Sequence, residues 1–171
     1  MPAVISQTQV LGVTARLSEA WEFLSGQRRE FELAEGGTEA LAYAEFSFFM
    51  SLAKEQSSRM GGVGVLIQAE DGFLVARHMF GMQQEEVTAN DVRDACAEVC
   101  NLFADCVAKE FGPNMTASFS LPCRASAEEF AMIPKNSRAR SVYRGRAGNH
   151  ILAIVLYDIL MNVSLDKEQE K

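Results

Sequence analysis

The stretch from Thr88 to Phe111, TANDVRDACAEVCNLFADCVAKEF, carries the strongest structural signal in this sequence. Its apolar residues recur at spacings of three and four, which is the pattern of a helix that buries one side. These residues are Val92, Ala95, Cys96, Val99, Leu102, Phe103, Cys106 and Val107. Thr88 and Asp91 have the spacing of a capping box, and Gly112 and Pro113 indicate a stop. The sequence therefore predicts one long amphipathic helix over this stretch.

The polar side of this predicted helix is not the one that helix stability alone would select. It carries Asp91, Asp94, Glu98, Asn101, Asp105 and Lys109. Asparagine costs roughly 0.5–0.7 kcal/mol relative to alanine inside a helix, because its amide competes for nearby backbone groups. Asp94 and Glu98 also repel each other at one-turn spacing. We therefore interpret Glu98 and Asn101 as a candidate functional pair, with an ordinary solvated helix face as the alternative.

The composition is that of a soluble globular protein. The chain has 171 residues, of which 48% are hydrophobic and 23% are charged. This length fits one domain with a hydrophobic core and leaves no room for two ordinary ones. We predict a single domain over residues 1–165 and a charged, disordered tail over residues 166–171.

Charge and hydropathy narrow the class of partner. The net charge of −7 disfavours binding to nucleic acid or to an anionic membrane surface. The N-terminal MPAVISQTQV has no basic stretch before an apolar core, so we expect no secretory signal. The longest apolar run, from Ile151 to Met161, is interrupted by Asp158 and is too short to cross a bilayer. We expect a cytoplasmic protein that binds neither nucleic acid nor membranes.

Four cysteines are present, and three of them fall on the predicted helix. Cys96 and Cys106 belong to its buried side, and Cys100 is expected at the margin of that side. A metal site could use Cys96, Cys100 and Cys123, but the chain has no CxxC pair and both histidines are distant in sequence. We expect free cysteines that act as small buried hydrophobes in a reducing compartment.

The rest of the chain predicts helices and strands in a mixed order. Before the long helix we expect a helix over Thr14–Gly26, strands over Arg28–Ala34 and Leu41–Leu52, a turn at Gly61 and Gly62, a strand over Val63–Ala69, and a short helix capped by Asp71 and ended by Gly81.

After the long helix, alternating residues predict a strand with Met115, Ala117, Phe119 and Leu121 on one side, ended by Pro122. A closing hairpin follows, with strands over Ala139–Arg146 and His150–Ile159 around Gly148 and Asn149. The last strand is apolar throughout, which predicts that both of its faces are covered. The fold class is therefore α+β, with a largely antiparallel sheet and long helices packed on it.

This order of elements resembles the CheC/CheX family of chemotaxis phosphatases. The resemblance rests on Asp94-x-x-x-Glu98-x-x-Asn101 on the long helix, on Pro122 after the following strand, and on the stretch from Val63 to the final strand. The chain carries one E-x-x-N motif and no duplicated half, which is closer to CheX than to CheC.

The resemblance implies a reaction and a partner. CheC and CheX hydrolyse the aspartyl phosphate of CheY-type response regulators, with magnesium held by the regulator and no cofactor of the phosphatase's own. Carried over to this chain, Asn101 positions the attacking water and Glu98 anchors a lysine of the regulator. Asp94 and Asp105, on the same face, are expected to contact the partner; Asp94 can equally serve only the helix dipole. CheX-like relatives form homodimers through sheet edges, so we also predict a homodimer, for which a long strand such as Leu41–Leu52 offers an edge if unprotected.

Two other functions stay open at this point. The family usually has a small residue one turn after the asparagine, where this chain has Asp105, and that difference favours a non-catalytic binding module that docks on a signalling or flagellar-motor protein. A metal-dependent hydrolase using Asp91, Asp94, Glu98 and Asp105 is disfavoured, because carboxylates from one helix cannot surround an ion. A basic stretch in the C-terminal part is expected to be a solvated face or a docking surface for an acidic partner; it comprises Arg124, Lys135, Arg138, Arg140, Arg144 and Arg146.

Overall fold

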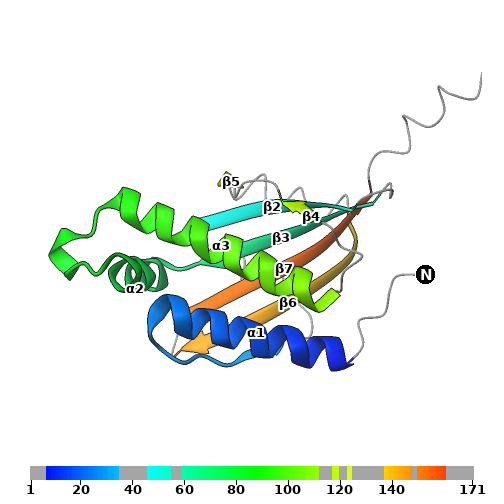
Figure 1. Ribbon diagram of the computed structural model, residues 1–171, viewed down its shortest axis with the longest axis horizontal. Helices are drawn as coiled ribbons and strands as arrows, with labels where there is room; N and C mark the ends of the chain where they lie inside the picture. Colours follow the sequence, from blue (N-terminus) through cyan, green and yellow to red (C-terminus); the bar gives the residue numbers. More distant parts are fainter. Residues whose placement is uncertain are drawn as a thin grey trace, which may run out of the picture.

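The structure is a computed structural model that describes residues 7–34, 46–54, 59–111, 117–119, 123–124, 137–147 and 150–160. Its elements are shown in chain order in Figure 1. They are α1 (Gln7–Ser25), β1 (Phe31–Leu33), β2 (Phe46–Lys54), β3 (Arg59–Ile67), α2 (Ala69–Phe80), the 3₁₀ turn η2 (Gln84–Glu86), α3 (Ala89–Phe111), β4 (Ala117–Phe119), β5 (Cys123–Arg124), β6 (Ser137–Ala147) and β7 (His150–Leu160).

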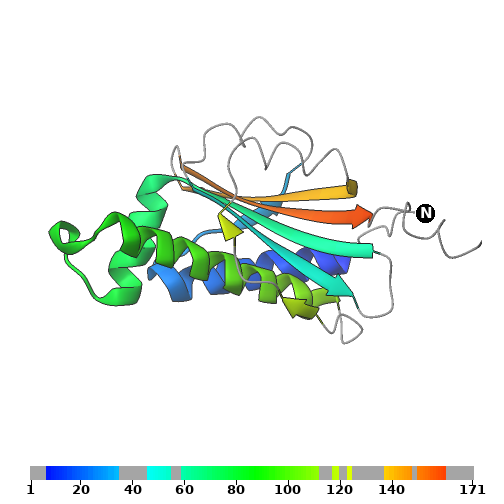
Figure 2. The ribbon, with the colours of Figure 1, turned by 90° about the horizontal axis from the view of Figure 1, so that it is seen from above.

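The described strands form one antiparallel sheet in the order β1-β6-β7-β3-β2-β4, with β5 also paired to β2. In the closing hairpin, Ala147 lies opposite His150, as the sequence predicts. Figures 1 and 2 show α1 and α3 along one face of the sheet and α2 at one end of it. The α+β class with helices packed on an antiparallel sheet is therefore confirmed. No helix within the described ranges is both long and apolar enough to cross a membrane.

The centre of the sheet is buried on both faces. Residues 63–67 of β3 and residues 152–155 of β7 are buried without interruption. Because successive side chains of a strand point to opposite faces, uninterrupted burial means that both faces are screened from water there. This confirms the prediction drawn from the apolar last strand.

α3 packs against α1, α2, β2 and β3, and the predicted apolar stripe faces them. Val99 and Phe103 are fully buried, and Leu102 is partly buried at the edge of the core. The buried side is wider than predicted, since Cys100 and Ala104 are also 0% exposed. The expected marginal position of Cys100 was therefore wrong, because elements pack on the flanks of α3 as well as beneath it.

The first helix begins at Gln7 rather than Thr14. Val10 is partly buried and Val13 fully buried, so the apolar spacing of Leu17 and Trp21 continues backward by two more turns. The helix ends where predicted, at Gly26, whose positive φ of 71° suits glycine.

The expected turn at Gly61 and Gly62 was wrong, since both glycines lie inside β3. Gly61 pairs with Leu52 of β2 and Asp158 of β7, and Gly62 follows in the same register. Glycine weakens a strand by only about 0.5–1 kcal/mol, which pairing on both sides outweighs. β2 is not a free edge of the sheet either, because β4 and β5 pair with residues along its other side.

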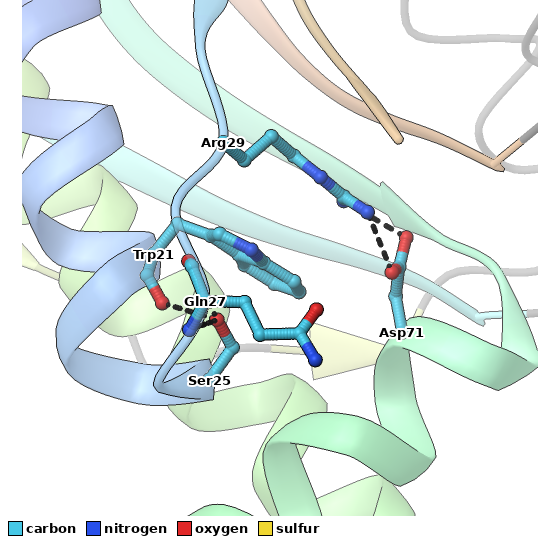
Figure 3. A network of polar contacts seen from close by, with 5 residues as sticks. All are labelled: Trp21, Ser25, Gln27, Arg29 and Asp71. Atoms are coloured by element: carbon cyan, nitrogen blue, oxygen red, sulfur yellow. Dashed lines mark hydrogen bonds and ion pairs between the residues drawn. The ribbon is translucent and has the colours of Figure 1, made fainter. Parts of the chain in front are cut away.

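Asp71 does not cap α2, contrary to the sequence prediction. The N-cap is Gln68, and Asp71 lies within the first helical turn and is buried. Its carboxylate accepts two hydrogen bonds from Arg29, at 3.0 and 2.8 Å, and both side chains are 3% exposed (Figure 3). The guanidinium carbon also lies 4.6 Å from the centre of the Trp21 ring. This network ties the end of α1, the approach to β1 and the start of α2 together.

Several predicted features lie outside the described residues. They are the first part of the strand over Leu41–Leu52, the helix stop at Gly112 and Pro113, the strand-ending Pro122, the turn at Gly148 and Asn149, and the tail over residues 166–171.

Candidate functional site

The outward face of α3 carries the four side chains that the sequence singles out. At about 100° per residue, Asp94, Glu98, Asn101 and Asp105 fall within a strip about 60° wide. Asp94 and Glu98 are exposed, whereas Asn101 and Asp105 are half-buried. The structure therefore brings the predicted catalytic pair and both predicted partner contacts onto one surface, opposite the buried stripe.

Glu98 and Asn101 touch each other. The Asn101 amide Nδ2 donates to Glu98 Oε2 at 3.4 Å, which is at the long end of the hydrogen-bond range. A carboxamide has two N–H donors and a carbonyl acceptor, so this contact uses one of its donors. The pair thus presents a neutral amide beside a carboxylate, an arrangement that can orient a small polar molecule and meet a cation at once.

Asp105 is paired with Lys109, one turn further along α3. Their charged atoms lie 2.8 Å apart, with the lysine side chain 60% and the aspartate side chain 42% exposed. An exposed pair of this kind contributes only about 0.3–0.5 kcal/mol to stability. Its consequence is electrostatic, because the ammonium offsets the carboxylate that would otherwise stand next to Asn101.

Asp91 belongs to the start of the helix rather than to the site. The Thr88 backbone N–H and hydroxyl donate to Asp91 Oδ2 at 2.8 and 2.7 Å, and the Asp91 N–H donates to Thr88 Oγ1 at 3.3 Å. The backbone hydrogen bond from Thr88, aided by the hydroxyl, holds the pKa of Asp91 below its usual value. The capping box predicted from the sequence is confirmed.

The inward side chains of α3 pack against other elements of the core and so hold the helix in place. The Phe103 ring meets Phe31 of β1 edge-on, with centroids 5.8 Å apart. The Cys106 thiol donates to the Arg16 carbonyl of α1 at 3.6 Å. Burial, with a smaller effect of Asp105, raises the pKa of Cys106 to about 11. These contacts make α3 a fixed support for its outward residues, and they leave Cys106 as a neutral packing group.

The metal hypotheses gain no support from the described residues. Among them, no three His, Cys, Asp or Glu side chains are grouped so that they could hold an ion. Cys96 and Cys100 are buried, while the side chain of Cys123 lies outside the described part. In the basic stretch, Arg144 is half-buried and Arg146 is exposed on β6.

Sequence reasoning missed the Asp105–Lys109 pair and the Arg29–Asp71 pair. The first had a local signal, because opposite charges four residues apart meet on a helix. The second had none, since its members come from separate elements.

No protein-family model matches this sequence, and no curated protein matches it. Solved structures do match it in fold. A chain of the CheX-CheY-BeF3-Mg complex from Borrelia burgdorferi has a TM-score of 0.63 at 13% identity, covering 91% of this chain and 99% of that one. A CheC-like protein from Shewanella oneidensis has a TM-score of 0.63 at 10% identity, covering 90% and 99%.

A chain from a different complex also shares the fold. A chain of the FliM-SpeE complex from Helicobacter pylori has a TM-score of 0.59 at 11% identity, covering 95% of this chain and 94% of that one. The chemotaxis proteins therefore share their architecture with a chain of this complex, and all of these similarities extend over nearly the whole length of both chains. The chain has a CheC/CheX-like fold.

Proposed function

We propose that this protein is a phosphatase that acts on the aspartyl phosphate of a CheY-type response regulator. One observation carries the proposal: Glu98 and Asn101 contact each other at 3.4 Å on the outward face of a helix whose other side is fixed in the core. The fold supports it, because a CheX protein with the same architecture is known in complex with CheY, BeF3 and magnesium.

The reaction asks little of the phosphatase beyond positioning. A water oxygen attacks phosphorus in line, the bond from phosphorus to the carboxylate oxygen breaks, and inorganic phosphate leaves the regenerated aspartate. The Asn101 amide orients that water through one donor and its carbonyl acceptor. Because the amide is neutral, it does not repel the phosphoryl group as a carboxylate would.

The neighbouring charges fit roles in docking. Glu98 is exposed beside the amide and pairs with a lysine of the regulator. Asp94 lies on the same strip of α3 and contacts the regulator at the edge of the interface. Asp105 keeps its pairing with Lys109, so its charge is offset near the phosphoryl group. Magnesium belongs to the regulator in this scheme, and the phosphatase contributes no ligand to it.

The test is the decay of a phosphorylated CheY-type regulator, measured with and without the protein. The wild-type chain is expected to accelerate decay catalytically, at substoichiometric amounts. Asn101→Ala should abolish most of the acceleration, and Glu98→Ala should weaken both binding and turnover. Glu85→Gln serves as the matched control, since it removes one exposed negative charge on η2, outside the outward strip of α3. Decay that is unchanged by excess wild-type protein contradicts the proposal.

The FliM-like similarity favours a second function, a non-catalytic module that docks on a signalling or flagellar-motor protein. This function predicts regulator or motor-protein binding with an unchanged rate of phosphoryl loss. The same decay assay, combined with a direct binding measurement, separates the two functions.

We also propose that the protein is a cytoplasmic homodimer. Because β2 is covered by β4 and β5, the contact would use another part of the sheet. Sedimentation that shows only an 18.8 kDa species at micromolar concentration contradicts the dimer.

A further inference from the structure

We infer that Phe23 of α1 is an apolar anchor for the same partner, forming one docking surface with Glu98 and Asn101 of α3. The inference rests on the proposed function, because it assigns the partner as the regulator's receiver domain. Phe23 is 76% exposed, more than Leu11, Leu33, Phe73 or Phe80, the other exposed large apolar residues of the described part. No chemistry or packing described above uses this side chain.

The position of Phe23 follows from how α1 and α3 pack. The helices run in opposite directions and contact each other (Figure 1). The Arg16 carbonyl of α1 meets the Cys106 thiol of α3 at 3.6 Å, so these residues are level with each other. Phe23 is seven residues after Arg16, and Val99 is seven residues before Cys106. Both steps cover about 10 Å, so Phe23 lies level with Val99, between Glu98 and Asn101 in sequence.

Phe23 is also on the correct side of its helix. Residues seven apart share a helix face, so Phe23 lies on the same flank as Arg16. That flank faces α3, since the Arg16 carbonyl accepts from the Cys106 thiol at 3.6 Å. In Figure 1 the two helices draw apart toward the carboxyl end of α1, which is where Phe23 lies. The exposed ring therefore lies on the flank of α1 that faces α3, at the level of Val99.

The chemistry of this surface defines its occupant. Protein interfaces concentrate binding energy in a few aromatic residues surrounded by a polar rim. The two helices that carry this surface also bear exposed acidic residues, Glu19 and Glu22 on α1 and Asp94 and Glu98 on α3. The complementary partner presents an apolar side chain flanked by lysine or arginine, next to its phosphorylated aspartate. A receiver domain with those features can contact Phe23 while its phosphoryl group meets Asn101.

The experiment compares Phe23→Ala with Phe73→Ala, an identical change at an exposed phenylalanine of α2 that lies outside the proposed surface. Kd is measured by calorimetry against a CheY-type regulator loaded with BeF3 and magnesium, and kcat and KM are measured with the phosphorylated regulator. We expect Phe23→Ala to raise Kd and KM about tenfold, which corresponds to about 1.4 kcal/mol, with kcat within about twofold of wild type. Phe73→Ala should leave all three unchanged, and both variants should unfold within about 2 °C of wild type.

Ionic strength gives a second readout. The tenfold ratio of Kd between Phe23→Ala and wild type should persist at high salt, whereas the effect of Glu98→Ala should shrink. If Glu98→Ala weakens binding and Phe23→Ala leaves Kd within twofold, the inference about Phe23 is overturned while the proposed function stands. If Phe23→Ala lowers kcat and not binding, the docking role is also overturned. A wild-type protein that neither binds nor dephosphorylates the regulator overturns both.

Discussion

Replacing Asn101 with alanine should separate folding stability from activity. Asn101 is half-buried, and its side-chain amide donates the 3.4 Å hydrogen bond to Glu98. Alanine gains roughly 0.5–0.7 kcal/mol of helix propensity at this position. A long hydrogen bond between partly exposed groups contributes at most about 0.5 kcal/mol. The free energy of unfolding should therefore stay the same or rise by about 0.5 kcal/mol.

Activity should respond in the opposite way. The other members of the outward strip, Asp94, Glu98 and Asp105, are carboxylates and cannot replace a neutral amide beside a phosphoryl group. Losing one positioning group of this kind typically lowers kcat by about 10²-fold or more. Urea unfolding measures the stability, and single-turnover decay of the phosphorylated regulator measures the chemistry. A stability loss above about 1.5 kcal/mol means that the amide is structural. A stable variant with unchanged turnover refutes the catalytic role of Asn101.

Three further outcomes are expected. Asp71→Ala leaves the Arg29 guanidinium buried without its carboxylate partner, so the free energy of unfolding measured in urea should fall by about 3–5 kcal/mol. A fall of less than about 1 kcal/mol contradicts the structural role of the pair. Lys109→Ala exposes the charge of Asp105 and should slow dephosphorylation, whereas the same change in an Asp105→Ala background should have no effect, which a double-mutant cycle tests. The Cys106 thiol, with its pKa raised from 9.0 to about 11, should resist iodoacetamide at pH 8 until the protein is unfolded, as followed by peptide mass spectrometry. Its raised pKa favours the folded state fully below pH 9, and this contribution is lost as the pH rises toward 11.

The elements with a complete local pattern could be predicted from the sequence. α3 has a cap at Thr88, an apolar stripe and a polar face within one continuous stretch, and the structure reproduces all three. The β6–β7 hairpin likewise combines two strand patterns with a turn signal between them. The position of that signal implies the observed register, in which Ala147 pairs with His150. In both cases the interactions that define the element lie within a few residues of one another.

Elements that depend on distant neighbours could not be predicted in this way. Gly61 and Gly62 have a local preference for turns, but ladders to β2 and β7 place them inside a strand. Asp71 has the pattern of a helix cap, but Arg29 lies 42 residues away in sequence and takes its carboxylate.

The division of α3 into two sides explains how one fold can carry different functions. The inward side, with Val99, Phe103 and Cys106, meets the core and determines whether the helix forms and where it lies. The outward pair, Glu98 and Asn101, contributes little to that stability, so its residues can change while the fold is kept. Similarity in fold between such proteins therefore depends on the inward residues of this helix, whereas their chemistry depends on the outward residues. On this reasoning, the Asn101→Ala variant is itself a binding module of the second kind: it should occupy the regulator with near wild-type affinity and inhibit wild-type dephosphorylation by competition.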